Sequence, residues 1–177
     1  MMETYEFTVI ATGLDPQDEG FEALFYDAGC DDALVSFQKG HILVDFSREA
    51  SSLEEAIGSA VDNCRAAGAI VERVEPDPLV SLSDIATRSD MSRSAMTNYF
   101  KGHRSEGFPA PKARVTTASP LWDWSDVSIW LYHHDRVSKE TAIGATVFSV
   151  ANDLLECDDS NFRSQLHEKV TERIAAI

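Results

Sequence analysis

Apolar and polar positions along residues 1–76 predict a small mixed domain. Residues 5–12 alternate with the period of a strand, and Phe21, Leu24, Phe25 and Ala28 recur with the period of a helix. Two later apolar runs are joined by Lys39-Gly40, which is typical of a hairpin turn. The predicted elements are a strand at 5–12, a helix at 21–28, strands at 33–38 and 41–46, a helix at 53–67 and a strand at 69–75.

This order of elements is βαββαβ, the order of ferredoxin-like folds. Pro76-Asp77-Pro78 follows it, and neither a helix nor a central strand tolerates that sequence well. We therefore expect a first domain at 1–76, a second at 79–136 and a C-terminal helical segment at 137–177. The fold class is α+β. Ferredoxin-like domains host many functions, so the fold alone assigns none.

The charge of the chain is distributed unevenly. The 177 residues hold 15 Lys and Arg against 30 Asp and Glu, a net charge of −15, which in bulk argues against nucleic acid or an anionic membrane as a partner. Residues 1–78 carry 4 basic and 17 acidic side chains, whereas 88–114 carries six basic and two acidic ones. A basic segment in an acidic protein is a candidate site for phosphate contacts.

Residues 79–101 have the spacing of a helix-turn-helix. We predict Ser83 as the N-cap of the first helix, Ala86 at the helix crossing, Asp90 in the turn and Met91 as a core residue from the turn. Ser92 is the predicted N-cap of the second helix, and Ala95, Met96, Tyr99 and Phe100 are its apolar face. The opposite face carries hydrogen-bonding groups and cations, the types that contact base edges and phosphates.

Residues 79–131 resemble the winged helix-turn-helix of the MerR and phage AlpA/excisionase superfamily. The resemblance rests on Ser83-Asp84-Ile85-Ala86, Met91-Ser92-Arg93, Asn98-Tyr99-Phe100, Gly107-Phe108-Pro109-Ala110-Pro111, Arg114-Val115 and the segment 121–131. It implies a wing with Phe108-Pro109-Ala110-Pro111 as one limb and Leu121-Trp122-Asp123 as the other, then a helix from about Ser125. It also implies a recognition helix at 92–101 in the major groove of double-stranded DNA, with DNA-binding residues Ser92, Arg93, Ser94, Thr97, Asn98, Lys101, Arg104, Lys112 and Arg114.

The C-terminal segment predicts two amphipathic helices. Residues 138–157 carry a wide apolar stripe, and Phe162, Leu166, Val170 and Ile174 have helical spacing. These stripes can pack on their own domain or pair with a second chain. MerR-like regulators dimerise through a C-terminal helix, and a two-fold dimer suits an operator with two half-sites. We expect a homodimer.

No residue pattern supports an enzyme, a cofactor or a metal site. The chain has no Gly-rich phosphate loop, nucleophile elbow or HExxH motif, and the acidic groups near Asp15 and Asp31 lack the spacing of a calcium loop. Adjacent His133 and His134 point apart on a helix, and Trp122, Trp124 and Trp130 are better core residues than a base-stacking platform.

The number of cysteines indicates the redox compartment, and the length of the apolar runs indicates whether the chain spans a membrane. Cys30, Cys64 and Cys157 are few, odd in number and far apart, so we expect free thiols in a reducing cytoplasm, with Cys30 and Cys64 as core residues. Neither thiol has an evident basic neighbour. We expect no membrane span and no secretory signal at Met1–Glu6.

The leading hypothesis is a bacterial or phage sequence-specific DNA-binding transcriptional regulator. Its main alternative is an antitoxin-like or adaptor module, in which the acidic N-terminal domain binds a basic protein partner and DNA contact serves only autoregulation. A third reading makes the N-terminal domain a small-molecule sensor, because ACT-like domains share its element order. No convergent polar pocket is visible for such a ligand.

Overall fold

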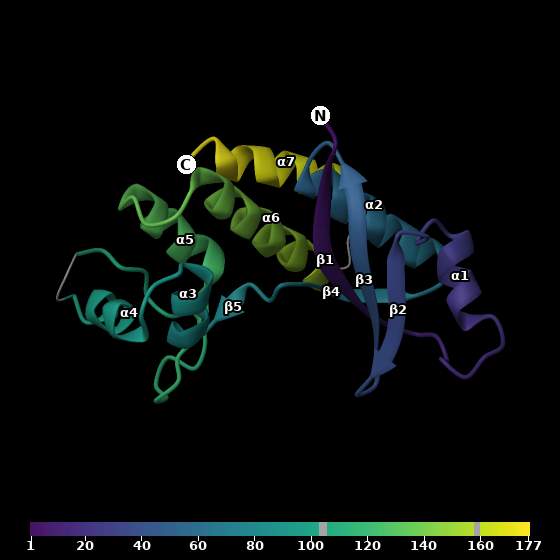
Figure 1. Ribbon diagram of the computed structural model, residues 1–177, viewed down its shortest axis with the longest axis horizontal. Helices are drawn as coiled ribbons and strands as arrows, with labels where there is room; N and C mark the ends of the chain where they lie inside the picture. The colour runs from purple at the N-terminus through teal and green to yellow at the C-terminus, as the bar shows by residue number, and fades with distance from the viewer. Residues whose placement is uncertain (103–105, 158–159) are drawn as a thin grey trace. The chain divides into compact units, whose positions relative to one another are not determined.

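The protein is an α+β chain whose computed structural model describes residues 1–102, 106–157 and 160–177 (Figure 1). The chain divides into two compact units. Unit 1 consists of residues 1–76 and 150–176, and unit 2 of residues 77–149 with the last residue. The helical segment predicted at 137–177 is therefore shared between the two units, because the long helix α6 (Lys139–Glu156) contributes its first part to unit 2 and its last part to unit 1.

Unit 1 is built on a four-stranded antiparallel sheet in the order β2-β3-β1-β4. Its elements are β1 (Glu3–Thr12), α1 (Phe21–Asp27), β2 (Ala33–Gln38), β3 (His41–Ala50), α2 (Leu53–Ala66), β4 (Ile70–Glu75) and α7 (Phe162–Ile174). Ser52 is the N-cap of α2, since its hydroxyl accepts a hydrogen bond from the N–H of Glu55 at 3.1 Å. The strand β3 extends four residues beyond its predicted end.

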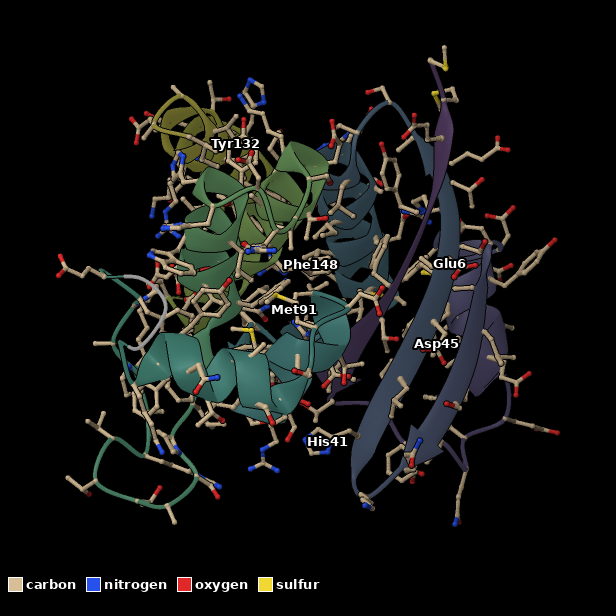
Figure 2. All side chains as sticks on the ribbon, turned by 60° about the vertical axis from the view of Figure 1, so that its left-hand side comes forward. Glu6, His41, Asp45, Met91, Tyr132 and Phe148 are labelled. Carbon is tan, nitrogen blue, oxygen red and sulfur yellow. The ribbon has the colours of Figure 1, made fainter. Side chains whose placement is uncertain are left out.

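The sheet has one buried and one polar face because side chains alternate along each strand. Val9, Val44 and Val74 lie in register on the buried face, which contacts α2. Glu6 and Asp45 lie on the opposite face and are exposed (Figure 2). The domain core therefore lies on one side of the sheet, and the other side carries acidic side chains such as Glu6, Asp45 and Glu75.

A buried arginine connects the sheet to the segment after α1. The guanidinium of Arg48 forms two hydrogen bonds with the carboxylate of Asp32, at 2.8 and 2.9 Å, and donates to the carbonyl of Gly29 at 2.8 Å. It also donates to Ser59 and Asn63 on α2 at 3.0 and 2.8 Å. The side chain is only 8% exposed. Paired and hydrogen-bonded in this way, the charge is tolerated inside the domain.

Cys30 and Cys64 are buried core residues, as predicted. The expectation that they have no basic neighbour is wrong, because the fold brings Arg48 close to both. A hydrogen bond from the Cys64 thiol lowers the pKa of Cys30 against the effect of burial, and the charge of Arg48 lowers it further. That bond and burial raise the pKa of Cys64. Arg48 lies eighteen residues from Cys30 along the chain, so no local pattern indicates the contact.

Unit 2 is a mainly helical unit closed by a two-stranded antiparallel sheet. Its elements are β5 (Leu79–Val80), α3 (Leu82–Arg88), α4 (Arg93–Phe100), β6 (Trp122–Asp123), α5 (Trp124–His133) and the first part of α6. The core is formed by Val80, Ile85, Ala86, Met96, Tyr99, Trp122, Trp124, Val127, Leu131 and Ala145. Trp122 and Trp124 are buried in it and Trp130 packs against it, which confirms the prediction that the tryptophans are core residues.

The apolar stripes of the two C-terminal helices are buried within the chain. Val150, Ala151 and Leu154 of α6 are at most 1% exposed, and Phe162, Leu166 and Val170 of α7 are at most 2% exposed. The helix α7 packs on α2 inside unit 1. Of the two roles that the sequence left open for these stripes, the structure shows packing on the same chain. The homodimer stays a prediction that needs another surface.

Candidate nucleic-acid interface

The helix α3 begins two residues earlier than the sequence suggests. Ser81, not Ser83, is its N-cap: the Ser81 hydroxyl accepts from the N–H of Asp84 at 3.2 Å, and the Asp84 carboxylate accepts from the N–H of Ser81 at 2.8 Å. The hydrogen bond from the Ser81 hydroxyl also lowers the pKa of Asp84. This reciprocal capping box outcompetes the predicted cap, and Ser83 becomes an exposed residue of the first turn.

The connection between α3 and α4 is a tight turn with a left-handed residue. Asp90, which lies in the turn as predicted, has φ 53°, a conformation that Asp adopts more readily than most residues. The N–H of Met91 bonds to the carbonyl of Ala86 at 2.9 Å, and its side chain, labelled in Figure 2, packs against the core of unit 2. Ser89 is buried, and its hydroxyl donates to the carbonyl of Ile85 at 2.6 Å. The buried hydroxyl is therefore satisfied within its own helix.

The helix α4 presents a polar face that carries no acidic residue. Its N-cap is Ser92, as predicted, with the hydroxyl accepting from the N–H of Ala95 at 3.1 Å. The Thr97 hydroxyl donates to the carbonyl of Arg93 at 2.9 Å, so both hydroxyls already have intrahelical partners. Arg93 and Ser94 are exposed at the start of the helix, Lys101 is exposed at its C-cap and Asn98 is half-buried. These four side chains are the ones best placed to meet a ligand.

A groove of about 610 Å³ runs between α3 and the start of α4. It is lined by Ser83, Ala86, Thr87, Asp90, Met91, Ser92 and Arg93. The sequence prediction missed Ser83 and Thr87 as residues of this surface. Their signal was the exposed i, i+4 spacing on α3, opposite the buried Ile85. The groove places the hydroxyl-bearing residues Ser83 and Thr87 of α3 beside the N-terminal end of α4, with Asp90 and Arg93 also in its lining.

Two of the six basic residues of 88–114 have partners inside unit 2. Arg88 donates to the carbonyl of Asp77 at 2.9 Å and lies over the ring of Trp124 at 5.7 Å, and burial lowers its pKa. Lys112 forms ion pairs with Asp123 at 3.1 Å and Asp126 at 3.5 Å. Partial burial lowers the pKa of Lys112, but these carboxylates raise it above its ordinary value.

The charge of Lys112 is therefore compensated within the unit, and its role as a DNA contact stays a prediction. Arg93, Lys101 and Arg114 are exposed, and none forms an ion pair with a carboxylate in the described part of the chain. Arg104 lies outside the described residues. The cations that remain for phosphate contacts are thus fewer than the sequence suggests.

The predicted wing limb at Phe108-Pro109-Ala110-Pro111 is wrong. The pairing occurs at the next two residues of the chain. The N–H of Lys112 donates to the carbonyl of Leu121 at 2.8 Å, and the N–H of Leu121 donates to the carbonyl of Ala113 at 2.9 Å. Proline lacks an N–H, so Pro109 and Pro111 cannot donate to a ladder. Phe108 instead packs edge-on against Trp130, and the carbonyl of Pro109 accepts from the indole of Trp122 at 3.0 Å. Arg114, with φ 51°, begins the exposed loop between the paired residues.

The other candidate chemistry has structural explanations. His134 stacks on Trp130 with ring centroids 3.7 Å apart, and its Nδ1 lies 2.8 Å from the Trp130 carbonyl. In residues 1–102, 106–157 and 160–177, no group of three or more His, Cys, Asp or Glu side chains is arranged to hold a metal ion. None of the helices described has both the length and the apolar character needed to cross a membrane. Comparison with models of known protein families, with curated proteins and with solved structures finds no match to this chain.

Proposed function

We propose that the protein is a sequence-specific double-stranded DNA-binding transcriptional regulator that reads its site with α4. One observation carries the proposal. In a chain of net charge −15, residues 92–101 contain no acidic residue, and the face of α4 turned away from the core carries hydrogen-bonding and cationic side chains. Such groups bind phosphates and the base edges of the major groove. The helix follows a tight turn from α3, which is the layout of a helix-turn-helix.

The same proposal assigns a ferredoxin-like fold to unit 1 and a winged helix-turn-helix fold to unit 2. The element order βαββαβ and the strand order β2-β3-β1-β4 support a ferredoxin-like unit 1. The pairing of β5 with β6, and of Ala113 with Leu121, supports a short wing of the MerR/AlpA kind in unit 2. In this proposal, the acidic unit 1 lowers affinity for DNA in general, and α4 supplies the preference for one sequence.

A salt titration of DNA binding tests the function directly. The affinity of the full chain is measured for a random-sequence duplex and for the duplex upstream of its own gene, at several salt concentrations. We expect tighter binding to the upstream duplex and a linear fall of log affinity with log salt, whose slope counts the phosphate contacts. Equal binding to both duplexes contradicts sequence-specific recognition, and no binding to either at low salt contradicts DNA binding altogether.

Replacing Arg93 by alanine should weaken binding to the preferred duplex by about 10- to 100-fold. It should also lower the ratio of the affinity for the preferred duplex to the affinity for the random-sequence duplex. Arg93 is exposed at the start of α4, where a side chain can reach a base edge.

Arg114→Ala should instead weaken binding to both duplexes equally and lower the salt slope by about one. Lys169→Ala, an exposed lysine of α7 in unit 1, is the control of equal charge. An equal loss on every sequence for Arg93→Ala rules it out as a base-reading residue.

The adaptor alternative has one observation in its favour. A groove of about 570 Å³ on the polar face of the sheet is lined by the carboxylates of Glu6, Asp45 and Glu75 together with Thr8 and Ser47. Such a surface suits a basic peptide. Calorimetric titration with a short arginine-rich peptide tests it: binding that is lost in Glu6→Gln/Asp45→Asn supports the adaptor, and equal binding by this variant contradicts it.

A further inference from the structure

The two edges of the sheet in unit 1 differ in how they are protected. At the β4 edge, the side-chain amide of Asn152 donates to the carbonyl of Val74 and accepts from its N–H, both at 2.9 Å. The same strand carries charged side chains and a register shift opposite Ile10/Ala11, and Pro76 follows it. Charges, bulges and proline are the features that keep an edge strand from pairing with another chain.

The β2 edge has none of these features. This strand, Ala33–Gln38, has the sequence ALVSFQ, without a charge or a proline. In the described part of the chain it pairs only with β3 and forms the outer strand of the sheet (Figure 1). Leu34 is 70% exposed and Phe37 is 45% exposed. An uncharged, apolar edge of six residues is a ready template for a further strand.

The hydrogen-bond register shows which backbone groups face the open edge. The carbonyl of Asp32 accepts from the N–H of Ser47, so Asp32 and Ser47 are a bonded pair in the β2–β3 register. Bonded and non-bonded pairs alternate in an antiparallel ladder, so Leu34 and Ser36 bond to β3. Val35 and Phe37 therefore direct their N–H and C=O groups away from β3.

We propose that a second copy of this chain docks on the open edge, with β2 pairing antiparallel to β2 about a two-fold axis at Val35. Charge favours a second copy as the occupant. Two-fold pairing centred on Val35 brings Lys39, in the turn after β2 of one copy, near Asp31, in the turn before β2 of the other, at both ends of the paired strands. The two copies each carry a charge of −15, so they can approach closely only where the surface is uncharged or complementary.

A groove beside the edge offers space for side chains of the partner copy. It has a volume of about 260 Å³ and lies between α1 and β2, lined by Glu22, Ala23, Tyr26, Cys30, Ala33, Leu34 and Val35. Tyr26 on its rim is 65% exposed. The sheet of the dimer is then continuous across both copies, and this surface replaces the C-terminal stripes as the dimer interface.

Sedimentation velocity of the full chain over a range of concentrations, without DNA, tests the proposal independently of the proposed function. We expect a monomer–dimer equilibrium whose dissociation constant rises at least about tenfold in Leu34→Lys, because lysine on an edge strand opposes pairing. Ile70→Lys is the matched control: Ile70 is 63% exposed and lies on the opposite edge strand. A chain that stays monomeric, or a dimer that both variants weaken equally, overturns the proposal.

A charge exchange tests the antiparallel register. Lys39→Asp should weaken the dimer about tenfold, because it sets an aspartate of one copy against Asp31 of the other. The double variant Lys39→Asp/Asp31→Lys restores opposite charges and should return the dissociation constant to that of the parent chain. Restoration is the result expected if the two positions meet across copies. Failure of the double variant to recover, with circular dichroism showing it folded, overturns the proposed pairing.

Discussion

Arg48→Ala will lower the free energy of unfolding of unit 1 by about 3–5 kcal/mol. The substitution removes the common donor of four groups: the Asp32 carboxylate, the Gly29 carbonyl, and the side chains of Ser59 and Asn63. The partly buried Asp32 is then left without its counter-ion, and the buried acceptors lose their hydrogen bonds. The stacking of the guanidinium on Phe46, at 4.6 Å, is lost as well.

Amide hydrogen exchange and urea unfolding will measure this loss. Exchange at β1 and β3 reports the stability of unit 1, whereas tryptophan fluorescence reports unit 2, which contains all three tryptophans. Glu49→Ala is the control, since Glu49 is the exposed neighbour of Arg48 on β3. Arg48→Lys should recover only part of the stability, because an ammonium group cannot reproduce the planar, multidentate contacts of a guanidinium. A loss below about 1 kcal/mol for Arg48→Ala would show that the buried pair contributes little net stability.

The sequence predicted the elements of unit 1 and missed the contact that ties them together. Hydrophobic alternation is a local signal, so it located the strands and α2 to within a few residues. The contacts of Arg48 with Gly29 and Asn63 join residues that are far apart along the chain, and a local residue pattern does not predict such contacts. An arginine at an inward position of a strand, between Phe46 and Ala50, was the one available sign.

In unit 2, local signals competed with one another. Both Ser81 and Ser83 are acceptable N-caps, and Asp84 decides between them because it completes a capping box with Ser81 alone. The two prolines of 108–111 argue against a paired limb at these residues, because a proline has no N–H to donate to a neighbouring strand. A family resemblance predicts which residue types occupy which positions of the wing. The strand pairing itself depends on which backbone groups can form hydrogen bonds.

For the candidate site, the sequence located the polar face of α4 but overestimated the number of available cations. Arg93, Ser94 and Lys101 are exposed where the helical periodicity places them. The charge count of 88–114 could not show that Lys112 meets Asp123 and Asp126, which lie 11 and 14 residues further along the chain. Charge runs report composition, whereas binding depends on the charges that the fold leaves uncompensated.

Trp122→Ala will destabilise unit 2 by about 3–5 kcal/mol. Trp122 is fully buried, and its ring contacts Phe100 at the end of α4 edge-on, with centroids 5.1 Å apart. It also contacts Phe108 at 6.3 Å and donates its indole N–H to the Pro109 carbonyl. The side chain of Trp122 thus connects the end of α4, at Phe100, to the segment that contains Phe108 and Pro109. Its removal leaves a large cavity and an unpaired carbonyl.

The conservative variant separates these two effects. Trp122→Phe keeps an aromatic ring against Phe100 and loses the hydrogen bond to Pro109, so we expect a smaller loss of about 1–2 kcal/mol. Urea unfolding followed by the fluorescence of Trp124 and Trp130 measures both variants. If unit 2 presents α4 to DNA as proposed, Trp122→Ala should also weaken binding to every duplex in proportion to its unfolded fraction, while the preference between duplexes is retained. A changed preference in the folded fraction would instead place Trp122 among the residues that orient α4 for base recognition.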